Sequence, residues 1–233
     1  MNHKPRVLVA CRIFEPELEM LRKPESNIEI RYLDQGLHRC PQKMPSLVQD
    51  QIEQVAARAG EIVLGYGLCS NGIAGVTASA QGLIVPRCHD CIAFFLGSCS
   101  AYREALKKRP GTYYLTAGWI HVGQDPLGII ENDYTPRLGR KTAVWGMKEE
   151  LKNYSHFVFI NTGADNPEHL RQRTAENAKF FNKKFKEVQG DLTYLNKLLY
   201  GPYLDEDFIF LKPGERIEQK MFLNYHSHAC EGD

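Results

Sequence analysis

The chain has 233 residues, of which 43% are hydrophobic and 24% charged, the composition of a globular domain rather than of a disordered segment. Because 29 Lys and Arg residues face 28 Asp and Glu residues, the formal net charge of +1 offers no general field for a nucleic acid or an anionic membrane. The sequence starts without a signal-peptide segment and no apolar run approaches ~18 residues, so we expect a cytoplasmic protein with no membrane partner.

Short apolar runs alternate with amphipathic segments along the whole chain. The predicted strands cover residues 6–11, 28–33, 61–67, 82–86, 112–116, 156–161 and 208–211. The predicted helices cover residues 16–23, 46–60, 70–80, 92–109, 141–153 and 167–188, followed by a shorter helix that ends at 200–201. This alternation predicts an α/β fold with a doubly wound, mostly parallel sheet flanked by helices. We expect one domain over residues 1–233, with two Rossmann-like lobes, 1–120 and 140–212, and a tail, 213–233, as the alternative.

Local signals support several of these boundaries. Ser46 and Gln49 have the spacing of a capping box at a helix start, and Asn166 followed by Pro167 is typical of an N-cap with proline in the first turn. Residues 117–140 are rich in Gly, Pro and Asp, so we expect a loop there, and it is the one place where a hinge between two lobes fits.

Three of the seven cysteines share one position in the predicted sheet. An odd count and the lack of an export signal argue against a disulfide framework. Cys11 ends the first strand, Cys69 follows the third, and Cys91 follows the fourth. In a doubly wound sheet these strands are neighbours, and ligands bind outside their carboxyl ends. The sequence therefore predicts a metal site formed by these three thiols.

The residue types leave the metal open. Thiolates together with an imidazole suit zinc, ferrous iron or an iron–sulfur cluster, and both a [4Fe–4S] cluster and a catalytic Zn²⁺ fit three cysteines with one open position. Cys88 and Cys91 also have the spacing of a redox dithiol, and buried core cysteines are the remaining alternative. His226 and His228 lie in a tail that can fold back to a metal or stay apart from it.

A glycine-containing turn follows the third strand. It begins like a dinucleotide-binding fingerprint, but Ser70 occupies the third glycine position and no acidic residue is placed after the next strand, which excludes nicotinamide binding. Gly65 and Gly67 still allow the backbone to approach a ligand closely. We therefore assign Gly65, Gly67, Asn71 and Gly72 as candidate cofactor contacts.

Four ordered runs carry a resemblance to a known family. They are VAC at 9–11, LGYGLCSNG at 64–72, PRCHDCI at 86–92 and PGTYYLTAGW at 110–119. Together they resemble the domain of unknown function 1638 family over most of residues 6–212. The resemblance implies a cytoplasmic protein of bacteria or archaea, commonly anaerobes, sometimes encoded near corrinoid-dependent methyltransferases. The family pattern emphasises Cys11, His38, Cys69, His89, Asp90 and Cys91.

The leading hypothesis is a metal- or iron–sulfur-dependent enzyme that acts on a small molecule. Cys11, Cys69 and Cys91 would be the metal ligands, while His89, oriented by Asp90, would be a general acid/base or a fourth ligand. His38 would contact the substrate or donate a proton. If the family context applies, the chemistry is methyl or sulfur transfer linked to one-carbon metabolism, with a corrinoid protein or methyltransferase as partner. The alternatives are a non-catalytic metal or corrinoid carrier and a metal-free small-molecule binder.

Overall fold

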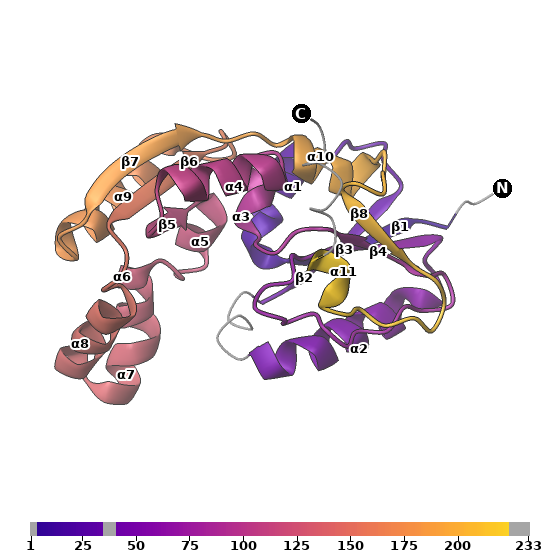
Figure 1. The fold of residues 1–233 in the computed structure, drawn as a ribbon, viewed down its shortest axis with the longest axis horizontal. Coiled ribbons are helices and arrows are strands. Elements are labelled where there is room, and N and C mark those ends of the chain that lie inside the picture. The colour runs from indigo at the N-terminus through magenta and orange to yellow at the C-terminus, as the bar shows by residue number, and fades with distance from the viewer. Residues whose placement is uncertain (1–3, 35–40, 224–233) are drawn as a thin grey trace, which may run out of the picture. The chain divides into compact units, whose positions relative to one another are not determined.

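The computed structural model describes residues 4–34 and 41–223 (Figure 1). The predicted site residue His38 and the tail residues His226 and His228 lie outside these ranges. The chain divides into two units, which are made of interleaved segments. Unit 1 contains Met1–Arg12, Leu21–Cys91 and Leu195–Asp233, and unit 2 contains Ile13–Met20 and Ile92–Tyr194. Within the described ranges, no helix has the length and apolar character needed to cross a bilayer.

Unit 1 is built on a five-stranded sheet. Its strands are β1 (Arg6–Cys11), β2 (Ile28–Leu33), β3 (Glu61–Gly65), β4 (Leu83–Pro86) and β8 (Phe208–Leu211) (Figure 1). Their order is β2-β1-β3-β4-β8, with the first four parallel and β8 antiparallel to β4. The chain places β2 on one side of β1 and then β3 and β4 on the other side. The doubly wound topology predicted from the sequence is therefore confirmed.

The apolar runs explain why these strands form the core. In β1, every residue from Val7 to Cys11 is fully buried, which accounts for a run without alternation. Gly65 lies opposite Ala10 in the register, and a Cβ at Gly65 would stand only 2.6 Å from the Cβ of Ala10. Glycine therefore lets β1 and β3 pack closely at their carboxyl ends, where the candidate site begins.

Two predicted details of unit 1 are wrong. Helix α2 (Met44–Ala56) starts before Ser46, and its first turn has no capping side chain, because Ser46 Oγ donates to the Lys43 carbonyl instead. The expected helix at 70–80 is a series of turns. Cys69, Ser70 and Asn71 all have positive φ, which is incompatible with a right-handed helix.

Unit 2 is built on a three-stranded parallel sheet of order β5-β6-β7. Its strands are β5 (Thr112–Leu115), β6 (His156–Asn161) and β7 (Lys184–Gln189). Strand β7 corrects the prediction of one helix over 167–188. Helix α9 (Pro167–Phe180) starts as predicted, with Asn166 Oδ1 accepting from the Glu168 amide, but the chain turns at Asn182, whose φ is 53°.

The remaining segments of unit 2 are more helical than predicted. The expected helix over 92–109 is interrupted at Gly97, whose φ of 81° ends the first helix, and Ser98 caps the second. These helices are α3 (Ile92–Phe95) and α4 (Cys99–Lys108). The expected loop at 117–140 consists mainly of short helices: α5 (Ala117–His121), α6 (Pro126–Ile129), a π-helical turn (Ile130–Tyr134) and α7 (Thr135–Leu138). Helix α8 (Arg140–Glu150) follows.

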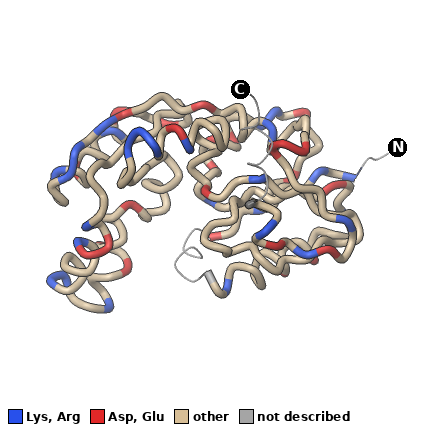
Figure 2. The backbone as a smooth tube through the Cα atoms, viewed as in Figure 1, with Lys and Arg blue, Asp and Glu red and all other residues tan. Residues whose placement is uncertain are grey.

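The remaining short elements include a 3₁₀ turn (Arg12–Phe14), α1 (Glu15–Leu21), α10 (Thr193–Tyr200) and α11 (Lys220–Leu223). A further 3₁₀ turn, Pro41–Lys43, precedes α2. Lys and Arg alternate with Asp and Glu along both units, in keeping with the near-zero net charge (Figure 2). The protein is thus an α/β fold with two helix-flanked sheets, one mostly and one fully parallel. The predicted α/β class with mostly parallel strands is confirmed, whereas the leading prediction had a single sheet.

Candidate functional site

The thiols of Cys69 and Cys91 lie together in unit 1, with their Sγ atoms 3.0 Å apart. Cys69 follows β3 and Cys91 follows β4, and these strands are parallel neighbours, so both loops leave the same edge of the sheet. Cys11 is the last residue of β1, which lies beside β3 on its other side, and it is fully buried. The strand order therefore delivers three thiols to one edge, and two of them are in direct contact.

Backbone hydrogen bonds hold the two cysteine loops against each other. The Leu68 amide donates to the Cys88 carbonyl at 2.8 Å, and the Cys69 amide donates to the His89 carbonyl at 3.1 Å. Gly67 makes this approach possible, because a Cβ there would meet the Cys88 carbonyl oxygen and the Cys88 Sγ, each at 3.2 Å. The two loops thus extend the pairing of β3 and β4 beyond the sheet and fix the position of Cys69.

The turn that carries Cys69 has an unusual backbone. Cys69, Ser70 and Asn71 have φ values of 47°, 56° and 68°, and the Gly72 amide closes the turn on the Cys69 carbonyl at 3.0 Å. For L-residues the left-handed region costs roughly 1–2 kcal/mol per residue, less for Asn. Such strain persists where the surrounding structure enforces it, and it is concentrated at functional sites. Here the strained conformation turns the Cys69 side chain towards Cys91.

The surroundings of Cys69 favour its protonated thiol. The hydrogen bond to Cys91 raises the pKa of the Cys69 thiol well above its usual range, and burial and the proximity of Cys91, Asp90 and Cys11 raise it further. Burial is also the main reason why the pKa of Tyr66 is raised, with the three cysteines and Asp34 adding to the effect. Cys69 therefore has acidic and thiol neighbours, which disfavour its thiolate form.

The side chains of His89 and Asp90, in the loop after β4, have different surroundings. The His89 ring is exposed, and its Nε2 lies 3.2 Å from the Phe222 carbonyl in α11; because a carbonyl only accepts, Nε2 carries the proton of this bond. The ring of Phe222 lies 6.1 Å from the His89 ring, centroid to centroid. Asp90 is close enough to affect the Cys69 thiol. The His89 backbone thus supports Cys69, while its ring is held by the C-terminal helix.

The chain was compared with protein families, curated proteins and solved structures. The family described as "Protein of unknown function (DUF1638)" matches residues 32–199. The chain belongs to the DUF1638 family. No curated protein and no solved structure matches it. The matched region of this DUF1638 protein contains Cys69, His89 and Cys91, whereas Cys11 precedes it.

The predicted glycine contacts of the DUF1638 protein are explained locally by packing. The space beside Gly65 is filled by Ala10, the space beside Gly67 by the Cys88 loop, and the space beside Gly72 by the side chain of Met44, whose Sδ would lie 2.6 Å from a Cβ. Asn71 is exposed. Protein atoms fill the space beside the three glycines, and Asn71 alone faces solvent. The role of these four residues in binding a cofactor stays a prediction.

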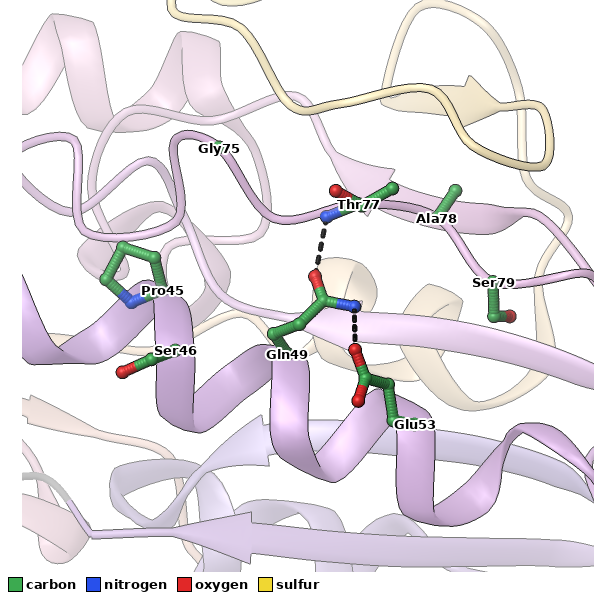
Figure 3. Close-up of a pocket in the computed structure, with 8 residues that line it drawn as sticks. All are labelled: Pro45, Ser46, Gln49, Glu53, Gly75, Thr77, Ala78 and Ser79. Carbon is green, nitrogen blue, oxygen red and sulfur yellow. Dashed lines mark hydrogen bonds between the residues drawn. The ribbon is translucent and has the colours of Figure 1, made fainter.

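A separate hollow of about 560 Å³ lies in unit 1 between α2 and the turns of residues 75–79 (Figure 3). Gln49 spans its wall, accepting from the Thr77 amide at 2.8 Å and donating to Glu53 at 3.1 Å (Figure 3). Its lining has hydroxyl, amide and carboxylate groups but no cysteine or histidine. This hollow therefore offers polar contacts and no thiol chemistry, and sequence reasoning did not find it because its residues are far apart in the chain.

The thiol edge of the DUF1638 protein fits a metal only in part. Among residues 4–34 and 41–223, no three His, Cys, Asp or Glu side chains are grouped closely enough to hold an ion. The Cys69–Cys91 pair is the fragment of such a site that these residues supply. Cys99 begins α4 in unit 2 and does not belong to it. The close partner of Cys91 is Cys69, and Cys88 is buried against Gly67.

Proposed function

We propose that this protein is a metal–thiolate enzyme acting on a small molecule, in which Cys69 and Cys91 bind one soft metal ion. The observation that carries the proposal is the 3.0 Å distance between their Sγ atoms. Thiolates bind Zn²⁺ at about 2.3 Å, so two of them on one tetrahedral ion lie about 3.8 Å apart. The pair needs to open by less than about 1 Å to reach that arrangement.

The same distance argues for a single ion over an iron–sulfur cluster. On a four-iron cluster each iron holds one terminal thiolate, and these thiolates point away from the cluster centre. Their sulfurs must lie much farther apart than two thiolates on one ion. A [4Fe–4S] cluster would therefore require Cys69 and Cys91 to separate, against the backbone bonds that join their loops. Zn²⁺ fits this donor pair better, with Cys11 as the nearest candidate for a third thiolate.

The side chains around the pair give it a defined chemical environment. The raised pKa keeps Cys69 a thiol at neutral pH, and it must release its proton to bind a cation, so metal affinity should rise with pH. A bound soft cation would supply a Lewis acid that polarises a substrate or holds a sulfur or methyl acceptor. The Nδ1 of His89 is the ring nitrogen left for proton transfer, because Nε2 is bonded to Phe222. Methyl or sulfur transfer to a small molecule, with a corrinoid protein or methyltransferase as partner, remains the proposed reaction class.

A redox dithiol is a second candidate that the same distance favours. A disulfide bond is about 2.05 Å long, so closing the pair also requires about 1 Å of movement. In this reaction a small-molecule disulfide accepts two electrons, Cys69 and Cys91 lose their protons and become joined, and two small thiols leave. The raised pKa of Cys69 slows this route, because the thiolate is the nucleophile.

Metal analysis of anaerobically purified protein tests the two candidates. We expect a soft metal in the wild-type protein and in Cys99→Ser, and its loss from Cys69→Ser and Cys91→Ser, with little change in melting temperature because a chain of this size folds without metal. Metal retained equally in all four proteins would contradict the assignment.

The second candidate makes a different prediction for the same proteins. In oxidised glutathione, metal-free wild-type protein would convert two thiols into a disulfide. Neither Cys69→Ser nor Cys91→Ser would do so. Wild-type protein that purifies anaerobically without metal and also keeps both thiols in oxidised glutathione would refute both candidates. Such a result would leave Cys69 and Cys91 as packing residues.

A further inference from the structure

Two large apolar side chains stand exposed on the α7–α8 hairpin of unit 2. Leu138 is 56% exposed and Trp145 is 65% exposed, although burial of either side chain would lower the free energy. Tryptophan is enriched at the energetic centres of protein interfaces and depleted elsewhere on surfaces. We call this surface the Trp145 patch, and it comprises Tyr134, Leu138, Trp145 and the cations named below.

The Trp145 patch has a hollow that can take a side chain. A cavity of about 330 Å³ opens beside Leu138 and Trp145, with Tyr134 and Gly146 also in its wall. This volume is at the lower end of the range of roughly 300–1,000 Å³ that is typical of small-molecule pockets. Its mouth is open on the exposed hairpin, so it suits an apolar side chain of a partner better than an enclosed ligand.

Among the described residues around the patch, positive charges without an acidic partner outnumber the negative ones. The hairpin cations Arg137, Arg140, Lys141 and Lys148 are all exposed. Within residues 4–34 and 41–223, their side chains make no hydrogen bond or ion pair, whereas two acids of the same segment are engaged: Glu149 with Lys152, and Glu150 with Tyr134. Figure 2 shows both charges on this hairpin; Glu150, which lines the hollow, keeps its negative charge because Tyr134 is neutral, so the four cations, unpaired in the described part of the chain, outnumber this acid.

We propose that the Trp145 patch is a docking surface for an acidic protein segment that carries an apolar side chain. The apolar residue of the partner would enter the hollow beside Trp145, and its Asp or Glu residues would face the four cations. Charge complementarity selects this partner over a second copy of the chain, because a like copy would bring the same four cations to the interface. The π-helical turn at Ile130–Tyr134 orients Tyr134 at the edge of the hollow, and such turns often mark functional sites.

Peptide titrations monitored by tryptophan fluorescence test this proposal with the full chain. The probe is a short synthetic peptide with one Phe-Leu pair between runs of glutamate; the controls are a lysine-flanked Phe-Leu peptide and an all-polar glutamate peptide. We expect saturable binding of the first peptide only, weakening with added salt. We expect roughly 30-fold weaker binding in Trp145→Phe, monitored through labelled peptide, since a truncated hot-spot side chain has an effect of this size.

Matched variants separate the patch from nonspecific charge effects. The double variant Lys141→Glu with Lys148→Glu should lose binding, whereas Lys107→Glu with Lys108→Glu and the exposed-apolar control Leu106→Ala should bind as the wild type does. Equal binding of all three peptides, no saturable binding, or equal loss in both charge variants would overturn the proposal. Dimerisation abolished by Trp145→Phe, or binding to phosphatidylserine vesicles in place of the peptide, would overturn it as well.

Discussion

The Glu17 carboxyl offers a sharp test of the packing in unit 2. Its side chain is fully buried in α1, and Oε1 accepts from Thr162 Oγ1 at 2.8 Å, while Oε2 has no partner in residues 4–34 and 41–223. Burial raises the pKa of this carboxyl from 4.5 to about 7, against the smaller lowering effect of the Thr162 hydrogen bond. No ionised neighbour contributes, so the shift reports the loss of water around the carboxylate.

This shift sets the direction and size of a pH effect on stability. Between about pH 4.5 and pH 7 the folded chain keeps the Glu17 proton and the unfolded chain releases it, so the free energy of unfolding falls as the pH rises through this window. Each pKa unit corresponds to about 1.4 kcal/mol, which gives a total loss of about 3 kcal/mol. Glu17→Gln cannot ionise and should lose none of it.

Urea denaturation of the wild type and Glu17→Gln at several pH values measures this difference. We expect similar free energies of unfolding near about pH 5 and a variant that is more stable by about 3 kcal/mol near about pH 8.5. Glu19→Gln, on the exposed side of the same helix, should follow the wild type at every pH. A difference between wild type and Glu17→Gln that does not change with pH would refute the reasoning.

Substitutions at three further positions probe other packing claims by thermal or urea denaturation. Gly118→Ala should destabilise unit 2 by about 3 kcal/mol or more, because its Cβ would lie 1.8 Å from the Ile13 carbonyl oxygen; a loss under about 1 kcal/mol would contradict this packing. Asn166→Ala should cost about 1 kcal/mol through loss of the α9 cap, whereas Asn166→Ser should retain most of it. Ser70→Gly should stabilise unit 1 by up to about 1 kcal/mol by relieving its left-handed backbone, and a loss of stability would instead assign a contact to the Ser70 side chain.

Most strands were predictable because a buried strand consists of a short run of apolar residues. Residues 6–11 and 156–161 form strands with the predicted bounds, since each run is fully apolar at its centre and is bounded by charged or polar residues. Strand β7 was missed because Phe181, Phe185 and Val188 happen to keep helical spacing across the turn at Asn182. An edge strand with mostly exposed residues has no apolar run to reveal it.

The candidate site was predictable only in part. Parallel strands that end in cysteines indicate that the thiols share one edge, and Cys69 and Cys91 do meet there. Their direct contact depends on the left-handed turn at Cys69–Asn71. No sequence pattern predicts such a turn when its residues are not glycine. The interleaved units could not be read from the sequence either, because β8 joins the first sheet only after residues 92–194, which belong to unit 2.

The central claim is that Cys69 and Cys91 bind one metal ion, and X-ray absorption at the edge of the bound metal tests it most directly. The account predicts a shell of at least two sulfurs at about 2.3 Å in the wild-type protein, with no short metal–metal distance, and no bound metal to measure in Cys69→Ser. A short metal–metal path would establish a cluster instead. A shell of nitrogen and oxygen alone would contradict the role of both cysteines.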